Sequence, residues 1–240
     1  MVRGARKRAW DGPERLHSDM VATHELFDLT KASGELARLL DVEHPWEVLA
    51  RLDAFGKGLL DERRGAVHPT AIVNGPLFIE EGAEVGPYAL LEGPVYLAAG
   101  AQVGHAAYLR GPVALGPGAK VLHASEVKRS VLLAGARAPH FNYVGDSVVG
   151  HDVNLGAGVK LANFKAFGDE VKIGGHPTGL RKFGAAIGDG VSIGCNAVLA
   201  PGTIVGRDTI IYHGATVRGL VAARSIVKLR QPHETVTRDA

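Results

Sequence analysis

An aliphatic residue falls on every sixth position of the chain, without interruption, from Val67 to Leu133. The same spacing resumes from Val149 to Leu161 and again from Ile187 to Val217. A period of six fits neither the 3.6-residue repeat of a helix nor the alternation of a simple hairpin, and it is what a hexapeptide β-helix requires. The sequence therefore predicts an all-β fold, a parallel β-helix over residues 66–222 with about 18 residues per triangular coil.

The six-residue spacing breaks at two places, near 138–148 and at 164–184. In the first break Pro139 stands where the pattern calls for an aliphatic residue. Because loops that leave the wall of a solenoid commonly carry function, we expect an inserted loop at each break.

The residues before the repeat follow a different pattern. Between residues 24 and 65, leucines and aromatic residues recur at steps of three and four, which is typical of short amphipathic helices. We interpret this segment as a helical cap that covers the bare end of the β-helix, with docking to a partner as the alternative. We expect residues 1–23 to form a basic, disordered tail, for which contact with nucleic acid is the alternative, and residues 223–240 to form a polar C-terminal tail.

Composition narrows the class of protein further. The formal net charge is only +2, which does not favour nucleic acid or acidic membranes as partners. The single cysteine, Cys195, rules out an internal disulfide framework and fits a reducing compartment. No apolar run approaches the roughly 20 residues that span a bilayer, and no apolar segment follows the basic start of the chain as in a signal peptide. We therefore expect a cytoplasmic protein.

One histidine stands out as a candidate for chemistry. His140 lies in the first break, beside Asn142 and Tyr143 and off the aliphatic pattern. Its side chain has a pKa naturally near neutrality, which suits a general base. The alternative from the residues alone is an ordinary surface histidine.

The surrounding motifs resemble a known family. The run from His140 to Asp146 reads H-F-N-Y-V-G-D, residues 154–158 read N-L-G-A-G, and residues 181–189 read R-K-F-G-A-A-I-G-D. Together with Tyr108-Leu-Arg110 and Glu126-Val-Lys128, these motifs resemble the acetyltransferase half of bifunctional N-acetylglucosamine-1-phosphate uridylyltransferases. The sequence is even more similar to the archaeal sugar-1-phosphate nucleotidylyltransferase/acetyltransferases, over about residues 67–222.

The resemblance implies a left-handed β-helix, a homotrimer with active sites between subunits, and acetyl-CoA as co-substrate. It implies that His140 is the base that deprotonates the sugar ammonium. The implied sugar-phosphate ligands are Arg110, Lys128, Tyr143, Asn154 and Lys182, and the implied contacts to acetyl-CoA are Asn163, Cys195 and His213. Cys195 stands where the family has a serine and His213 where it has an alanine, so the donor side of the site departs most from the family.

The family's Gly-rich nucleotide-binding loop is absent from this sequence. Residues 1–65 are too short for a nucleotide-binding domain, so we expect that this chain does not transfer a nucleotidyl group. A separate nucleotidyltransferase is then the expected protein partner. The predicted function is N-acetylation of glucosamine- or galactosamine-1-phosphate in nucleotide-sugar synthesis.

Three alternatives remain open at the level of sequence. The chain could be a non-catalytic β-helix that binds sugar phosphate, or an acyltransferase with another donor or acceptor. A zinc enzyme similar to the γ-class carbonic anhydrases is the third, since His105 and His123 are 18 residues apart and should stack on adjacent coils. Zinc needs a third ligand. His140 lies one residue short of two coils from His105, so we expect no metal site.

Overall fold

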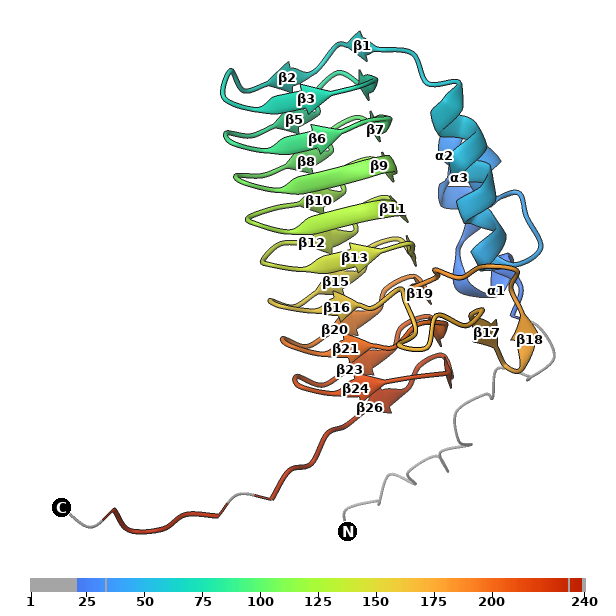
Figure 1. Ribbon diagram of the computed structural model, residues 1–240, viewed down its shortest axis with the longest axis vertical. Helices are drawn as coiled ribbons and strands as arrows, with labels where there is room; N and C mark the ends of the chain where they lie inside the picture. The colour runs from blue at the N-terminus through green and yellow to red at the C-terminus, as the bar shows by residue number, and fades with distance from the viewer. Residues whose placement is uncertain (1–20, 33, 233, 239–240) are drawn as a thin grey trace, which may run out of the picture.

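A computed structural model describes residues 21–32, 34–232 and 234–238. The chain is a parallel β-helix whose coils stack along one axis, with a group of short helices beside it (Figure 1). This confirms the predicted fold class. The part of the basic tail at residues 1–20 lies outside the described residues. No helix in the described part of the chain is long and apolar enough to cross a membrane.

Each coil contributes a short strand to each of three faces. The first face consists of β2 (Ala66–Val67), β5 (Glu84–Val85), β8 (Gln102–Val103), β10 (Lys120–Val121), β12 (Arg137–Ala138), β15 (Asn154–Leu155), β20 (Ser192–Ile193), β23 (Ile210–Ile211) and β26 (Ile226–Val227). The second consists of β3 (Ile72–Asn74), β6 (Leu90–Glu92), β13 (Tyr143–Gly145), β16 (Lys160–Leu161), β21 (Val198–Leu199) and β24 (Thr216–Val217). The third consists of β1 (Glu62–Arg63), β4 (Leu77–Ile79), β7 (Val95–Leu97), β14 (Val148–Val149), β19 (Ala185–Ile187), β22 (Thr203–Val205) and β25 (Leu220–Val221). Two longer strands, β9 (Tyr108–Leu115) and β11 (Glu126–Leu132), bend through a corner and belong to both the second and the third face.

The aliphatic residues of the six-residue repeat point inward and form one core along the axis. The repeat loses one residue in β11, where the register with β9 shifts after Lys128. From there on the inward residue is Leu132, and Leu133 faces outward beneath the helices. The next inward residues are Ala138 and Val144, so the core continues without a gap.

The prediction of an inserted loop near 138–148 is therefore wrong. These residues form β12, β13 and β14, which pair in parallel with the coils above and below. The corner of β11 has one residue fewer than the corner of β9, so all later aliphatic positions are shifted by one. In the sequence this shift interrupts the six-residue spacing, as an inserted loop would.

Residues 164–184 do leave the wall. They carry a small antiparallel hairpin, β17 (Lys172–Ile173) and β18 (His176–Pro177), and return to the wall at β19. Val171, Ile173 and Phe183 are buried against the outward side of the solenoid, so the insert is packed onto the structure.

The N-terminal segment forms the predicted short helices. They are α1 (Thr23–Leu26), η1 (Leu29–Lys31), α2 (Gly34–Leu40), η2 (Pro45–Glu47) and α3 (Val48–Lys57). Their position differs from the expected cap, because they lie along the third face and not over an end of the solenoid (Figure 1). Outward residues of that face, such as Tyr96, Ala114 and Val131, are buried beneath them. At the two ends of the solenoid, core residues such as Val67 and Val227 remain half-buried.

Polar contacts fix the start of this segment to the lower coils. Asp189 accepts hydrogen bonds from the backbone N–H of Asp28 at 2.6 Å and of His151 at 2.7 Å. The Asp189 N–H donates to the Leu26 carbonyl at 3.0 Å, and Arg207 donates to the His24 carbonyl at 2.8 Å. Asp189 therefore joins the wall to the helical segment.

The His151 imidazole is buried at this junction, and neither of its ring nitrogens has a hydrogen-bond partner. Burial lowers the pKa of His151, against a smaller opposing effect of Asp189. The unfolded chain then binds a proton more readily than the folded one, so this histidine costs stability as the pH falls through the unfolded value of 6.5.

We expect the wild-type protein to lose free energy of unfolding between pH 7.5 and pH 5, and His151→Leu to lose less. The difference is at most about 2 kcal/mol, since each pH unit below the unfolded pKa contributes about 1.4 kcal/mol. Urea midpoints of both proteins at the two pH values measure it. Equal pH dependence in the two proteins would contradict the assignment.

Candidate functional site

A cavity of about 810 Å³ lies where the second and third faces meet and the insert 164–184 crosses the corner. It brings together five of the predicted site residues, namely Arg110, Lys128, Tyr143, Asn163 and Lys182. Arg129, Asp146 and Arg181, which were not among the predicted ligands, also line it. The cavity is therefore strongly cationic, with one carboxylate in its wall.

The shape of this corner follows from the shortened strand. In β9 the corner is made by Gly111 and Pro112, whereas in β11 Arg129 alone makes the turn, with a φ of 44°. Asp146 makes the equivalent turn in the next coil, with a φ of 45°. Such left-handed turns at a corner hold Arg129 and Asp146 one above the other.

Asp146 is the electrostatic centre of the cavity. Its side chain is 1% exposed and accepts from Lys128 Nζ at 2.9 Å, from Arg129 Nη1 at 3.3 Å and from the Asn163 amide. Gly145 leaves room for this arrangement, since a Cβ there would lie 2.7 Å from both Asn163 Nδ2 and the Tyr143 hydroxyl. One buried carboxylate thus orients two cations and an amide around the same space.

The other cations differ in how far they are neutralised. Arg110 forms an ion pair with Glu126 at 2.9 Å. Arg181 and Lys182 are exposed, and neither forms an ion pair with a carboxylate of the described residues. Lys182 lies 5.8 Å from the centre of the Phe164 ring, on the inserted segment. The insert therefore supplies two positive charges that are available to an anion.

Tyr143 stands on the second face at the edge of the cavity. Its hydroxyl pKa is raised, first by burial and then by the nearby charges of Glu126 and Asp146. The phenol is therefore neutral at physiological pH and is able to donate a hydrogen bond to a ligand.

Three of the four remaining predicted residues lie at a different corner. His140, Cys195 and His213 are exposed at turns between the first and second faces. The hydrogen bonds from Gly158 N to His140 O and from Gly214 N to Cys195 O place them in one column along the solenoid. Asn154 points outward from β15 on the first face.

The structure thus divides the predicted site into two groups within one chain. Asn163, predicted to contact acetyl-CoA, lies in the cavity and not with Cys195 and His213. Asp146 makes a turn and is also an ion-pair partner. A sequence signal for the corner existed in Arg129, which takes the position that Gly-Pro holds in the preceding coil.

The spacing argument for the histidines was partly wrong. His105 and His123 do stack, with ring centroids 5.1 Å apart and their Nδ1 atoms 3.0 Å apart. His140 lies in the same column, one coil below His123, and the Phe141 N–H donates to the His123 carbonyl. Because β11 is one residue shorter than β9 at the corner, the 35-residue spacing from His105 to His140 corresponds to two full coils. In the described part of the chain, no three His, Cys, Asp or Glu side chains are grouped to hold a metal ion.

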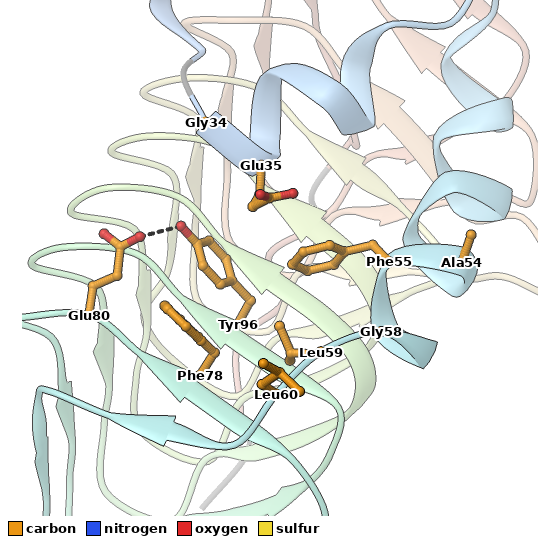
Figure 2. A pocket seen from close by; sticks show the side chains of 10 residues that line it. All are labelled: Gly34, Glu35, Ala54, Phe55, Gly58, Leu59, Leu60, Phe78, Glu80 and Tyr96. Atoms are coloured by element: carbon orange, nitrogen blue, oxygen red, sulfur yellow. Dashed lines mark hydrogen bonds between the residues drawn. The ribbon is translucent and has the colours of Figure 1, made fainter.

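A second cavity, of about 600 Å³, lies between the helices and the third face (Figure 2). Phe55, Phe78 and Tyr96 line it, and its charged lining residues are Glu35 and Glu80. The Tyr96 hydroxyl donates to Glu80, and burial raises the pKa of this tyrosine. Aromatic rings with carboxylates do not suit a phosphate, so the cationic corner is the candidate anion site.

The sequence matches two families of known proteins, and one of them is a hexapeptide-repeat family, in agreement with the β-helix fold. Residues 91–181 match the family described as the GMPPB C-terminal domain, and residues 184–219 match the bacterial transferase hexapeptide family of six repeats. The chain is a hexapeptide-repeat β-helix protein.

Its relatives define the group more closely. A bifunctional sugar-1-phosphate nucleotidylyltransferase/acetyltransferase of Sulfurisphaera tokodaii is 37% identical over 74% of this chain and 46% of that protein. A bifunctional protein GlmU of Methanococcus maripaludis is 45% identical over 78% of this chain and 46% of that protein. The chain belongs with these bifunctional proteins, archaeal members included, as its motifs predict, and it spans about half their length.

Among solved structures, the UDP-N-acetylglucosamine acyltransferase of Francisella novicida is similar over 68% of this chain and 60% of its own. The TM-score is 0.49 and the identity 14%, which is too distant to bear on activity.

We expect Asp146→Asn to lower the free energy of unfolding by roughly 3 kcal/mol, because it leaves Lys128 and Arg129 without their buried partner. Asp152→Asn is the matched control. Asp152 also has a left-handed φ, of 57°, but its side chain is 69% exposed in its ion pair with Lys31. Chemical denaturation of both variants measures the difference, and an equal small loss in both would show that the Asp146 network adds nothing to stability.

Proposed function

We propose that this protein is an acetyl-CoA-dependent N-acetyltransferase acting on an amino-sugar 1-phosphate, glucosamine- or galactosamine-1-phosphate. The observation that carries the proposal is the cationic cavity, in which the fold gathers five residues that the family motifs assign to this reaction. The relatives named as acetyltransferases support the reaction class.

The charge of the cavity suits a phosphate monoester. Lys128 and Arg129 are held by Asp146, and Arg110 is paired with Glu126. Arg181 and Lys182 remain as two positive charges for the two negative charges of a phosphate dianion. Guanidinium and ammonium groups donate charge-assisted hydrogen bonds to phosphate oxygens, and the Tyr143 hydroxyl adds a neutral donor.

In this proposal His140 accepts a proton from the sugar ammonium. A neutral imidazole is a suitable base near neutral pH, and the amine that it frees can attack the thioester carbonyl of the donor. The leaving thiolate of coenzyme A takes up a proton, so the reaction yields the amide and a free thiol.

The separation of the two groups supports a site built from more than one subunit. The cavity lies at one corner of the prism, whereas His140, Cys195 and His213 lie at another. In a homotrimer, the cavity of one subunit would meet the histidine corner or first face of the next, as the family resemblance implies.

Sedimentation of the purified protein tests the trimer. The same proposal places the protein in the cytoplasm, where it would work with a separate nucleotidyltransferase.

The decisive assay is release of free thiol from acetyl-CoA by the purified protein, with and without each sugar phosphate. Sugar-dependent release supports the proposal and ranks the two acceptors. Absence of release while the sugar phosphate still binds in calorimetry would favour a non-catalytic binding protein. Absence of both release and binding would remove this ligand class.

We expect His140→Ala to lower kcat by about 10²–10⁴, as for a lost general base. His105→Ala is the matched control, because His105 occupies the same corner of the solenoid two coils away and is also exposed. Steady-state thiol release measures both. An undiminished kcat in His140→Ala would take this residue out of the mechanism.

A further inference from the structure

Arg129 is held between two carboxylates from distant parts of the chain. Its Nε and Nη2 contact Asp53 of α3, at 3.0 Å and 2.5 Å. Its Nη1 contacts Asp146 at 3.3 Å. Two edges of one planar guanidinium are therefore occupied at once, which fixes both its position and its orientation.

The contact with Asp53 ties the helical segment to the cationic cavity. α3 packs directly against β9 and β11, the two strands that form the corner. The Arg129 and Asp53 side chains are 21% and 36% exposed, so the pair is partly screened from solvent. This pair raises the pKa of Arg129, and the hydrogen bonding that Arg129 donates to Asp53 is the largest cause.

The consequences reach the groups that would hold a phosphate. Asp146 shares its two oxygens between Arg129 on one side and Lys128 with Asn163 on the other. An Arg129 released from Asp53 would be free to turn about Asp146 and to reach a ligand in the cavity that it lines. Lys128 and Asn163 would then lose the fixed acceptor that orients them.

We propose that Asp53 is a positioning residue for the anion site, acting through Arg129 and Asp146, and that the lateral helical segment exists in part to supply it. The inference rests on the proposed function, since it assigns the cavity to the sugar phosphate. Asp53 itself does not line the cavity. Asp53 keeps the Arg129 guanidinium in its hydrogen bond with Asp146. Arg129 is thereby prevented from moving to bind the ligand itself.

The test is a double-mutant cycle of Asp53→Asn and Arg129→Lys. Asp53→Asn removes the charge with little change in shape, and Arg129→Lys keeps the charge but loses the planar fork. We expect each to raise the KM for the sugar phosphate about 10-fold while kcat stays within about 2-fold. The double variant should be no worse than either single variant, since both remove one interaction.

Glu35→Gln is the matched control, because it breaks the ion pair with Arg38, at 2.9 Å, in the same helical segment and away from the cavity. It should leave KM unchanged. Asp53→Glu retains the charge, so its KM should be at least about 3-fold lower than that of Asp53→Asn.

Three results would overturn the inference: an unchanged KM in Asp53→Asn, effects that multiply to about 100-fold in the double variant, or equal damage from Asp53→Glu and Asp53→Asn. If Asp53→Asn does not fold, the comparison of Arg129→Lys with Glu35→Gln decides, and equal KM values in these two variants overturn the inference. Failure of the proposed function is a separate result. In that case the wild-type protein neither releases thiol from acetyl-CoA nor binds glucosamine-1-phosphate in calorimetry, and this result does not depend on any Asp53 variant.

Discussion

The structure depends on the stacking of each coil in register on the next. Parallel backbone hydrogen bonds between coils place the inward aliphatic residues of each face above one another, and close packing of that core leaves little tolerance for a shift. A change of one residue in a coil is therefore absorbed at a corner and not in a face. In β11 this happens between Lys128 and Ser130, and the core passes from Val127 to Leu132 without interruption.

That single adjustment creates the cationic corner. Arg129 replaces Gly111 and Pro112 at the turn, and Asp146 takes the equivalent turn below it. A polar pair at a corner would ordinarily lie in solvent. Here the insert 164–184 covers one side and α3 the other, so Asp146 is buried and each of its oxygens has a partner. The proposed phosphate site is thus a consequence of a defect in the repeat.

The helical segment has a different role from an end cap. The third face carries apolar side chains on both its inner and outer sides, as in Val95-Tyr96-Leu97 and Ala185-Ala186-Ile187. Such a face needs a covering layer along its length. The helices and the insert share this covering, and Asp189 and Asp53 fix the helical layer to the wall. The inner core alone would not require it.

The β-helix, the short N-terminal helices and five of the residues in the cationic cavity could be predicted from the sequence. The aliphatic period of six reports directly on side chains that repeat once per face, and motifs such as His140 to Asp146 carry over by local spacing. Four features became visible only in the folded chain: the phase of the repeat after Lys128, the lateral position of the helices, the partners of Asp146, and the place of Arg129 and Arg181 in the cavity. These depend on contacts between residues far apart in the chain, such as Asp53 and Arg129, which no local period encodes.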